Sequence, residues 1–210
     1  MSSRWSWKPA HGERRETAPS TPSFSNDRRG DPDFVVRLIP LSDAQREPWR
    51  NGGGWTREIT RFPADSAEFD WRLSVAEVEA DGPFSRFDGC DRILVLLGGN
   101  GMELHTVGPP VTLRAPHDHL RFPGELAISA RLIAGPTTDL NLIWRRDRCT
   151  VVLHQIDPRA PMHIGGLPGE VVVAFTVATG AARVSEPGEG LLVGSDEYAI
   201  AFVIAPPATR

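Results

Sequence analysis

Residues 71–78 read WRLSVAEV, and apolar side chains alternate there with polar or small ones. Side chains two positions apart along a β-strand point to the same side of the sheet. The two faces of the predicted strand are Trp71, Leu73 and Val75 on one side and Arg72, Ser74 and Ala76 on the other. Because the first face is apolar, we expect Trp71 to pack in a core, which leaves the second face to hold polar groups.

Upstream, residues 48–58 read PWRNGGGWTRE and contain three consecutive glycines at 52–54. Glycine costs backbone entropy, so such a run indicates positions where φ is positive or a Cβ atom would clash. Asn51, just before the run, tolerates left-handed backbone and bonds its own main chain. Thr56 and Glu58 share a face if the chain continues as a strand. The segment predicts either a purely structural glycine turn or a turn that also forms part of a site.

A third cluster, GPFSRFDGCDR at 82–92, runs directly into the apolar stretch 93–97. The motifs are, in order, NGGG-x-T-x-E at 51–58, W-x-x-S-x-A-x-V at 71–78, G-x-F-S-x-F-x-G-x-D-R at 82–92 and L-x-G-x-G at 97–101. This series resembles the HutD/Ves family of bacterial proteins, and residues 122–125 and 139–142 also resemble its pattern. The resemblance covers residues 34 to 205 and implies a cupin-like β-barrel fold in two copies within one chain.

The composition sets limits on the class of protein. The net charge of −4 provides no basic surface for nucleic acid. Cys90 and Cys149 are too few for a disulfide scaffold or a zinc cage, so we expect buried, reduced thiols. The first 20 residues lack the apolar region of a signal peptide, and no apolar run is long enough to span a bilayer. We therefore expect a cytoplasmic protein that binds neither nucleic acid nor membrane.

Residues 1–33 contain almost no aliphatic side chains, which predicts a disordered tail. Beyond them, short apolar segments separated by Gly, Pro and Asp are typical of a β-sandwich or barrel. The predicted strands are 34–40, 55–62, 69–79, 92–98, 101–106, 110–114, 119–122, 126–133, 139–146, 149–155, 170–178, 181–185, 190–194 and 198–204. Residues 42–48 alone suggest a turn or two of helix, with Ser42 as N-cap. The predicted class is all-β with little helix.

An internal echo agrees with a duplicated fold. A strand, a glycine turn and a second strand occur at 93–106 and again at 171–184. A Pro-Gly-Glu follows each unit, at 123–125 and 187–189. We accordingly predict a bicupin, with an N-terminal half at 34–147 and a shorter C-terminal half at 148–210.

A cupin-like fold raises the question of a metal. His117 and His119 form a His-x-His pair with Glu125 six residues later, and both rings would point to one side of an extended segment. The usual cupin motif, however, has a glycine upstream and its Glu three or four residues after the second His. Pro116 also suggests an exposed turn. We expect no metal and no cofactor.

Nucleophilic and acid–base catalysis have little support. Ser74 and Ser85 lack the Gly-x-Ser-x-Gly elbow, and the glycines at 52–54 lack the lysine and the helix of a phosphate loop. Glu58, Glu77 and Asp91 are candidate acid–base groups, yet they form no spaced pair like that of glycosidases. No catalytic residue is predicted.

A recognition site fits the residues better. Arg72 and Arg92 carry forked guanidinium donors that suit a carboxylate. Phe84 and Phe87, with Trp71 as a third candidate, could wall a small pocket. The predicted ligand-binding residues are Asn51, Gly53, Thr56, Glu58, Ser74, Ser85, Arg92 and His105.

Structural alternatives remain open for several of these residues. His105 could face the barrel lumen, although a lone strand histidine is more often a hydrogen-bonded filler. Arg92 could simply form a salt bridge with Asp91, and Ser85 could cap a turn.

The HutD/Ves resemblance implies a role in bacterial histidine utilisation. We expect a non-enzymatic regulator or governor that binds a small carboxylate such as urocanate or a formylated glutamate, with Arg92 holding the acid group. One alternative is a cupin-type hydrolase or isomerase that uses Glu58 or His105 as its acid–base residue. Another is a protein-interaction scaffold. A homodimer could form through an edge strand.

Overall fold

The computed structural model describes residues 36–114, 116–194 and 197–207. Within them the regular structure is β-strand apart from one three-residue 3-10 turn, so the all-β class with little helix is confirmed. The predicted tail at 1–33 lies outside the described residues. In the part that is described, no helix combines the length and the apolar character that crossing a membrane requires.

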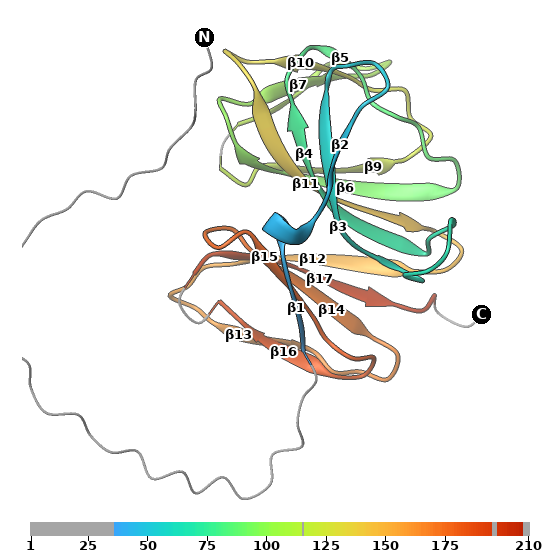
Figure 1. Ribbon diagram of the computed structural model, residues 1–210, viewed down its shortest axis with the longest axis vertical. Helices are drawn as coiled ribbons and strands as arrows, with labels where there is room; N and C mark the ends of the chain where they lie inside the picture. The colour runs from blue at the N-terminus through green and yellow to red at the C-terminus, as the bar shows by residue number, and fades with distance from the viewer. Residues whose placement is uncertain (1–35, 115, 195–196, 208–210) are drawn as a thin grey trace, which may run out of the picture. The chain divides into compact units, whose positions relative to one another are not determined.

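The middle layer is a six-stranded antiparallel sheet (Figure 1). Its strands, in spatial order, are β2 (Arg46–Pro48), β3 (Gly54–Phe62), β4 (Trp71–Val78), β11 (Thr137–Arg145), β6 (Cys90–Gly98) and β9 (His119–Pro123). A four-stranded sheet lies against one of its faces. This second sheet has the order β5 (Gly82–Pro83), β10 (Ser129–Leu132), β7 (Met102–His105) and β8 (Val111–Leu113).

A five-stranded sheet packs on the other face of the middle layer. Its order is β1 (Arg37–Pro40), β15 (Ala181–Val184), β14 (Val171–Thr176), β17 (Ala199–Ala205) and β12 (Thr150–Ile156), and β13 (Met162–Gly165) pairs separately with β16 (Gly190–Val193). The first described strand thus pairs with the late strand β15, with Ile39 opposite Ala182. The division into two cupin-like halves at residue 147 remains a prediction.

The main core lies between the six-stranded and five-stranded sheets. Trp71 and Leu73 of β4 pack there with Phe175 of β14 and Phe202 of β17. A second cluster joins Leu94 and other residues on the opposite face of the middle sheet to the four-stranded sheet. The predicted apolar face of residues 71–78 is therefore confirmed. Both cysteines are buried and free, as expected.

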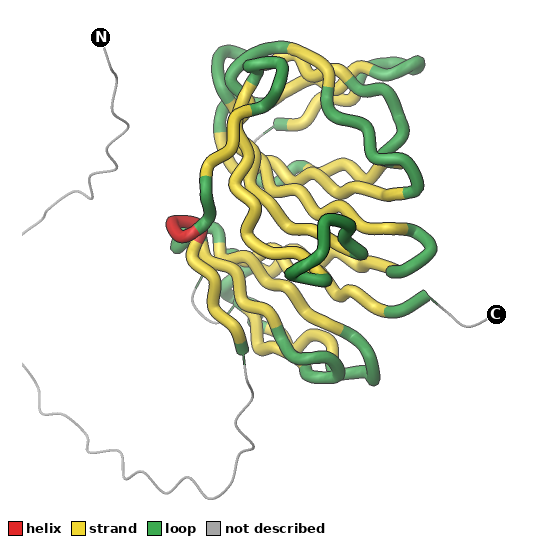
Figure 2. Tube along the Cα trace, turned by 45° about the vertical axis from the view of Figure 1, so that its right-hand side comes forward, coloured by secondary structure: helices red, strands yellow, loops and turns green. Residues whose placement is uncertain are grey.

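The predicted helix at 42–48 is wrong. The chain makes a 3-10 turn at Leu41–Asp43 and then enters β2, which pairs with β3 (Figure 2). Ser42 does not cap the turn, because its hydroxyl donates to Asp43 Oδ1 at 3.2 Å and Pro40 occupies the N-cap position. Pairing with β3 has overridden the weak local preference for helix.

The glycine run forms the tight turn between β2 and β3, as predicted. Gly52 has a φ of 71°, and Asn51 Oδ1 accepts a hydrogen bond of 3.0 Å from the Gly53 N–H. Gly54 lies so close to β4 that a Cβ atom there would overlap the carbonyl oxygen of Glu77. The third glycine is therefore required by the approach of two strands and not by the turn itself.

These positions make a matched pair of alanine substitutions informative. Gly54→Ala should lower the free energy of unfolding by about 1–3 kcal/mol, because the new methyl group forces β3 away from β4. Gly53→Ala should cost much less, since a Cβ atom there meets only the Asn51 side chain at 3.4 Å. Urea unfolding of both variants checks the difference, and equal losses would refute the assigned clash.

Candidate functional site

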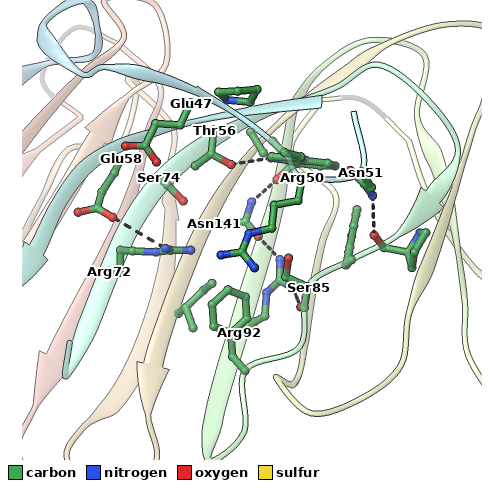
Figure 3. Close-up of a pocket in the computed structure, with 18 residues that line it drawn as sticks. Glu47, Arg50, Asn51, Thr56, Glu58, Arg72, Ser74, Ser85, Arg92 and Asn141 are labelled. Carbon is green, nitrogen blue, oxygen red and sulfur yellow. Dashed lines mark hydrogen bonds and ion pairs between the residues drawn. The ribbon is translucent and has the colours of Figure 1, made fainter. Parts of the chain in front are cut away.

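A pocket of about 580 Å³ opens on the polar face of the middle sheet, opposite the main core (Figure 3). The β2–β3 turn and the segment after β5 form its walls. The lining residues are Glu47, Pro48, Trp49, Arg50, Asn51, Thr56, Glu58, Arg72, Ser74, Ala76, Pro83, Phe84, Ser85, Phe87, Arg92, Asp139, Asn141 and Ile143. Its floor combines charged side chains from several neighbouring strands, which is unusual for a surface that is mostly buried.

The register of β4, β11 and β6 arranges the side chains of the pocket floor in rows that run across the strands. Ile143 of β11 lies opposite Arg72 of β4 on one side and opposite Arg92 of β6 on the other. In the next row Asn141 lies opposite Ser74. Because every second residue faces the pocket, the same strands present Leu140 and its apolar neighbours to the main core.

Arg92 is the most deeply placed cation of the floor, with 7% of its surface exposed. Its Nη2 donates to Asn141 Oδ1 at 2.9 Å and its Nη1 donates to the Ser85 carbonyl at 3.2 Å. The ring of Phe122 lies 5.0 Å from the guanidinium carbon. Burial lowers the pKa of Arg92 to about 10, with Asp139 opposing that shift, so the side chain is still charged at neutral pH. Among the described residues, its Nε has no partner.

Arg72 is the second cation of the same row. It lies 3.8 Å from Glu58 Oε2, and burial lowers its pKa while Glu58 opposes that shift. Glu58 is already held by Arg61, whose Nη2 donates to Oε2 at 2.6 Å. Arg72 Nε is also buried without a partner among the described residues. Each floor arginine therefore has a buried Nε–H that lacks a partner in the described part of the chain.

Asp139 lies beside these cations on β11 and is 1% exposed. Asn141 Nδ2 donates to its Oδ1, while its Oδ2 has no hydrogen-bond partner in the described part of the chain. Burial raises the pKa of Asp139 to about 7, although Arg92 and the hydrogen bond from Asn141 both act to lower it. The floor thus holds a carboxyl group that changes charge near neutral pH.

Aromatic and loop residues complete the walls. Trp49 Nε1 donates to Thr56 Oγ1 at 2.8 Å, and its ring meets Phe84 edge-on with centroids 6.3 Å apart. Asn51 Nδ2 reaches the Pro83 carbonyl at 3.5 Å and so links the glycine turn to β5. Arg50 extends from the turn into the pocket (Figure 3).

A family model described as HutD matches residues 41–201, which is well over half of the chain. The chain belongs to the HutD family. Two bacterial relatives agree with this assignment. An uncharacterized 21.2 kDa protein in the hutC 3' region of Pseudomonas putida is 41% identical over 123 residues, which are 58% of this chain and 65% of that protein. Protein Ves of Citrobacter koseri is 38% identical over 125 residues, 59% of this chain and 63% of Ves.

Solved structures support the fold. HutD from Pseudomonas fluorescens SBW25 has a TM-score of 0.72 at 26% identity, covering 83% of this chain and 100% of that one. Ylba from Escherichia coli has a TM-score of 0.63 at 9% identity, covering 88% and 97%, which indicates a shared fold alone. The HutD-family assignment and the cupin-like fold class are therefore confirmed, whereas the duplication stays a prediction.

The pocket of this HutD-family chain brings together six of the eight predicted ligand-binding residues. They are Asn51, Thr56, Glu58, Ser74, Ser85 and Arg92. Gly53 lies in the turn behind the wall, where its carbonyl accepts hydrogen bonds from the Glu79 and Ala80 N–H groups. The alternative of a salt bridge between Asp91 and Arg92 is wrong, because Asp91 pairs with Arg121 at 3.0 Å and with Arg146 at 3.2 Å instead.

His105 is not part of the pocket, and the expectation that it faces the barrel interior is wrong. In β7 the buried positions are Met102 and Leu104, so the alternation turns His105 outward. Its side chain is 44% exposed, and its Nε2 lies 3.3 Å from Glu103 Oε2.

Asp139 and Asn141 were missed as site residues, although they belong to a motif that resembles the family pattern. Their strand carries a usable signal, since Asp139, Asn141 and Ile143 alternate with Leu140, Leu142 and Trp144. Two polar residues two positions apart in an otherwise apolar strand indicate that one face lines a site.

The His-x-His segment has a structural setting. The His117 ring stacks on Tyr198 with centroids 3.9 Å apart, and Gln155 Nε2 bonds the His117 carbonyl at 2.8 Å and His119 Nδ1 at 3.1 Å. Glu125 is ion-paired with Arg146 elsewhere. Among the described residues, no group of three or more His, Cys, Asp or Glu side chains is arranged to hold a metal ion.

The raised pKa of Asp139 makes stability depend on pH. The native state binds a proton here more tightly than the unfolded chain does, so this stability is complete below about pH 4 and is lost as the pH rises through about 7. Relative to the natural protein, the free energy of unfolding of Asp139→Asn should therefore rise between pH 5 and pH 8. The rise should be a few kcal/mol, at about 1.4 kcal/mol per pKa unit. Urea unfolding at both pH values measures this gain. Asp88→Asn, at an exposed position, is the control. The assignment would be contradicted if, for both variants alike, the difference in unfolding free energy from the natural protein did not change with pH.

Proposed function

We propose that this protein is a non-enzymatic binder of a small carboxylate that regulates histidine utilisation, with urocanate or a formylated glutamate as its ligand. The observation that carries the proposal is the pair of guanidinium groups in one row of the pocket floor, Arg92 buried and Arg72 largely so. Arg72 and Arg92 each keep a buried Nε–H without a partner among the described residues. A carboxylate accepts hydrogen bonds from several donors at once and is the anion that arginine side chains bind best.

The charges around the pocket favour an anion. Glu58 is neutralised by Arg61, and Asp139 is only partly ionised near pH 7. Arg72 and Arg92 remain cationic, and Arg50 adds a third positive group at the wall. Electrostatic interactions are stronger in a partly desolvated site than in bulk water, so an incoming carboxylate gains more here than at an exposed arginine.

Size and wall chemistry favour a small organic acid. A pocket of about 580 Å³ lies within the range of small-molecule sites. Trp49, Phe84 and Phe87 provide apolar faces against which a planar or short carbon skeleton can pack.

The link to histidine utilisation rests on relatives. The Pseudomonas putida protein lies in the hutC 3' region, and the Pseudomonas fluorescens HutD structure was determined in a formate condition. Formate is the smallest carboxylate and the parent acid of the formyl group of formylated glutamate. Two features favour binding over the alternative of acid–base catalysis: Glu58 is held by Arg61, and His105 lies outside the pocket.

A thermal-shift titration tests the proposal. The purified full chain is titrated with urocanate, formylglutamate, formate, histidine and divalent metals. One of the acids should raise the melting temperature saturably and independently of chelator. Arg92→Lys should weaken binding of that acid about tenfold or more, because the unpaired Nε–H is lost while a positive charge is kept.

Arg131→Lys is the matched control, since Arg131 is a largely exposed arginine on β10 outside the pocket. It should leave the response unchanged. Stabilisation by a metal alone would favour an enzyme, and no response to any acid would favour the scaffold; either result would overturn the proposal.

A further inference from the structure

Asp139 Oδ2 is a buried carboxylate oxygen on the pocket wall with no hydrogen-bond partner in the described residues. Buried polar atoms are nearly always paired, so an unpaired one in a residue that lines a pocket calls for a partner from outside the chain. Building on the proposed function, we propose that Asp139 contacts the ligand, and that the bound acid carries an N–H group that donates a hydrogen bond to Asp139 Oδ2.

The hydrogen bonds around Asp139 give this subsite its direction. Arg92 Nη2 donates to Asn141 Oδ1, which leaves the Asn141 amide nitrogen as the donor toward Asp139 Oδ1. One carboxylate oxygen is therefore already occupied by a donor. The ionised carboxylate has acceptors only, so its second oxygen requires another donor.

The distance along β11 between the arginine row and Asp139 sets the distance between the carboxylate and the N–H group of the proposed ligand. Ile143 marks the row of Arg72 and Arg92, and Asp139 lies four residues along the same strand. At about 3.4 Å per residue the two rows are roughly 14 Å apart at the backbone. The Arg92 side chain closes much of that distance, because it reaches Asn141 midway.

Asp139 has a small side chain next to it on the β4 side. Its neighbour across β4 is Ala76, and both residues line the pocket. The short Ala76 side chain takes up little of the pocket wall beside Asp139. The ligand class that fits is a small acid whose N–H lies several bonds from its carboxylate, as in an N-acylated amino acid or an azole acid.

Binding should depend on pH through Asp139. The charged groups that face it across the pocket, from β2, the β2–β3 turn, β3, β4 and β6, are Glu47, Arg50, Glu58, Arg72 and Arg92. The N–H group requires the ionised carboxylate, whose pKa in the free protein is raised to about 7 by burial. Affinity should therefore fall as the pH is lowered from 8 to 6, while Arg92, with a pKa of about 10, keeps its charge.

Isothermal titration of the full chain tests the inference with three probes. They are N-formylglutamate, the ester analogue in which oxygen replaces the N–H, and formate. The natural protein should bind the amide about tenfold more tightly than the ester, because a hydrogen bond to a charged acceptor is lost. In Asp139→Asn this preference and the loss of affinity between pH 8 and pH 6 should both disappear, while formate binding remains.

Thr137→Val is the matched control. Thr137 lies on the same strand and also carries a buried oxygen without a partner among the described residues, but it is not part of the pocket lining. The variant should keep the amide preference. Equal binding of amide and ester to the natural protein, or a preserved preference in Asp139→Asn, would overturn the inference and leave the carboxylate site intact. Failure of all three probes would overturn both.

Discussion

Burying a guanidinium is costly unless its donors are satisfied, and the floor of this pocket buries Arg92 and most of Arg72 in one row of the middle sheet. Arg92 meets this requirement in part through the Ser85 carbonyl, Asn141 and the surrounding phenyl rings. These partners come from three separate segments of the chain. The loop after β5, strand β11 and strand β9 must therefore be in place before Arg92 can be held, so the site depends on the complete middle sheet.

The same strands meet opposite demands on their two faces. On one face, β4 and β11 contribute Trp71, Leu142 and their neighbours to the buried main core. On the other face, they contribute Ser74 and Asp139 to the pocket. The five-stranded sheet stabilises the first face by apolar burial. That stability offsets the cost of unpaired polar atoms on the second face, and a bound acid would remove part of the cost by pairing them.

Local sequence was sufficient for features that depend on short spacing. The two faces of residues 71–78, the glycine turn and the side shared by Thr56 and Glu58 all follow from a period of two or from a single backbone requirement. Local sequence could not predict which strands pair with one another. Nothing near Asp139 in the chain indicates that Arg92, 47 positions earlier, lies one strand away. The outward turn of His105 and the conversion of the expected helix at 42–48 into β2 likewise depend on which distant strand is the neighbour.

Ile143 shows how register limits what the pocket can bind. It separates Arg72 from Arg92 in their shared row, so the two cationic strands are about 10 Å apart at the backbone. An acidic residue at this position would neutralise both arginines and fill the place of a ligand. An apolar residue instead keeps the two guanidinium groups positive and leaves their inner N–H groups for a carboxylate. The choice of side chain at one buried position thus favours an anion site over an internal salt bridge.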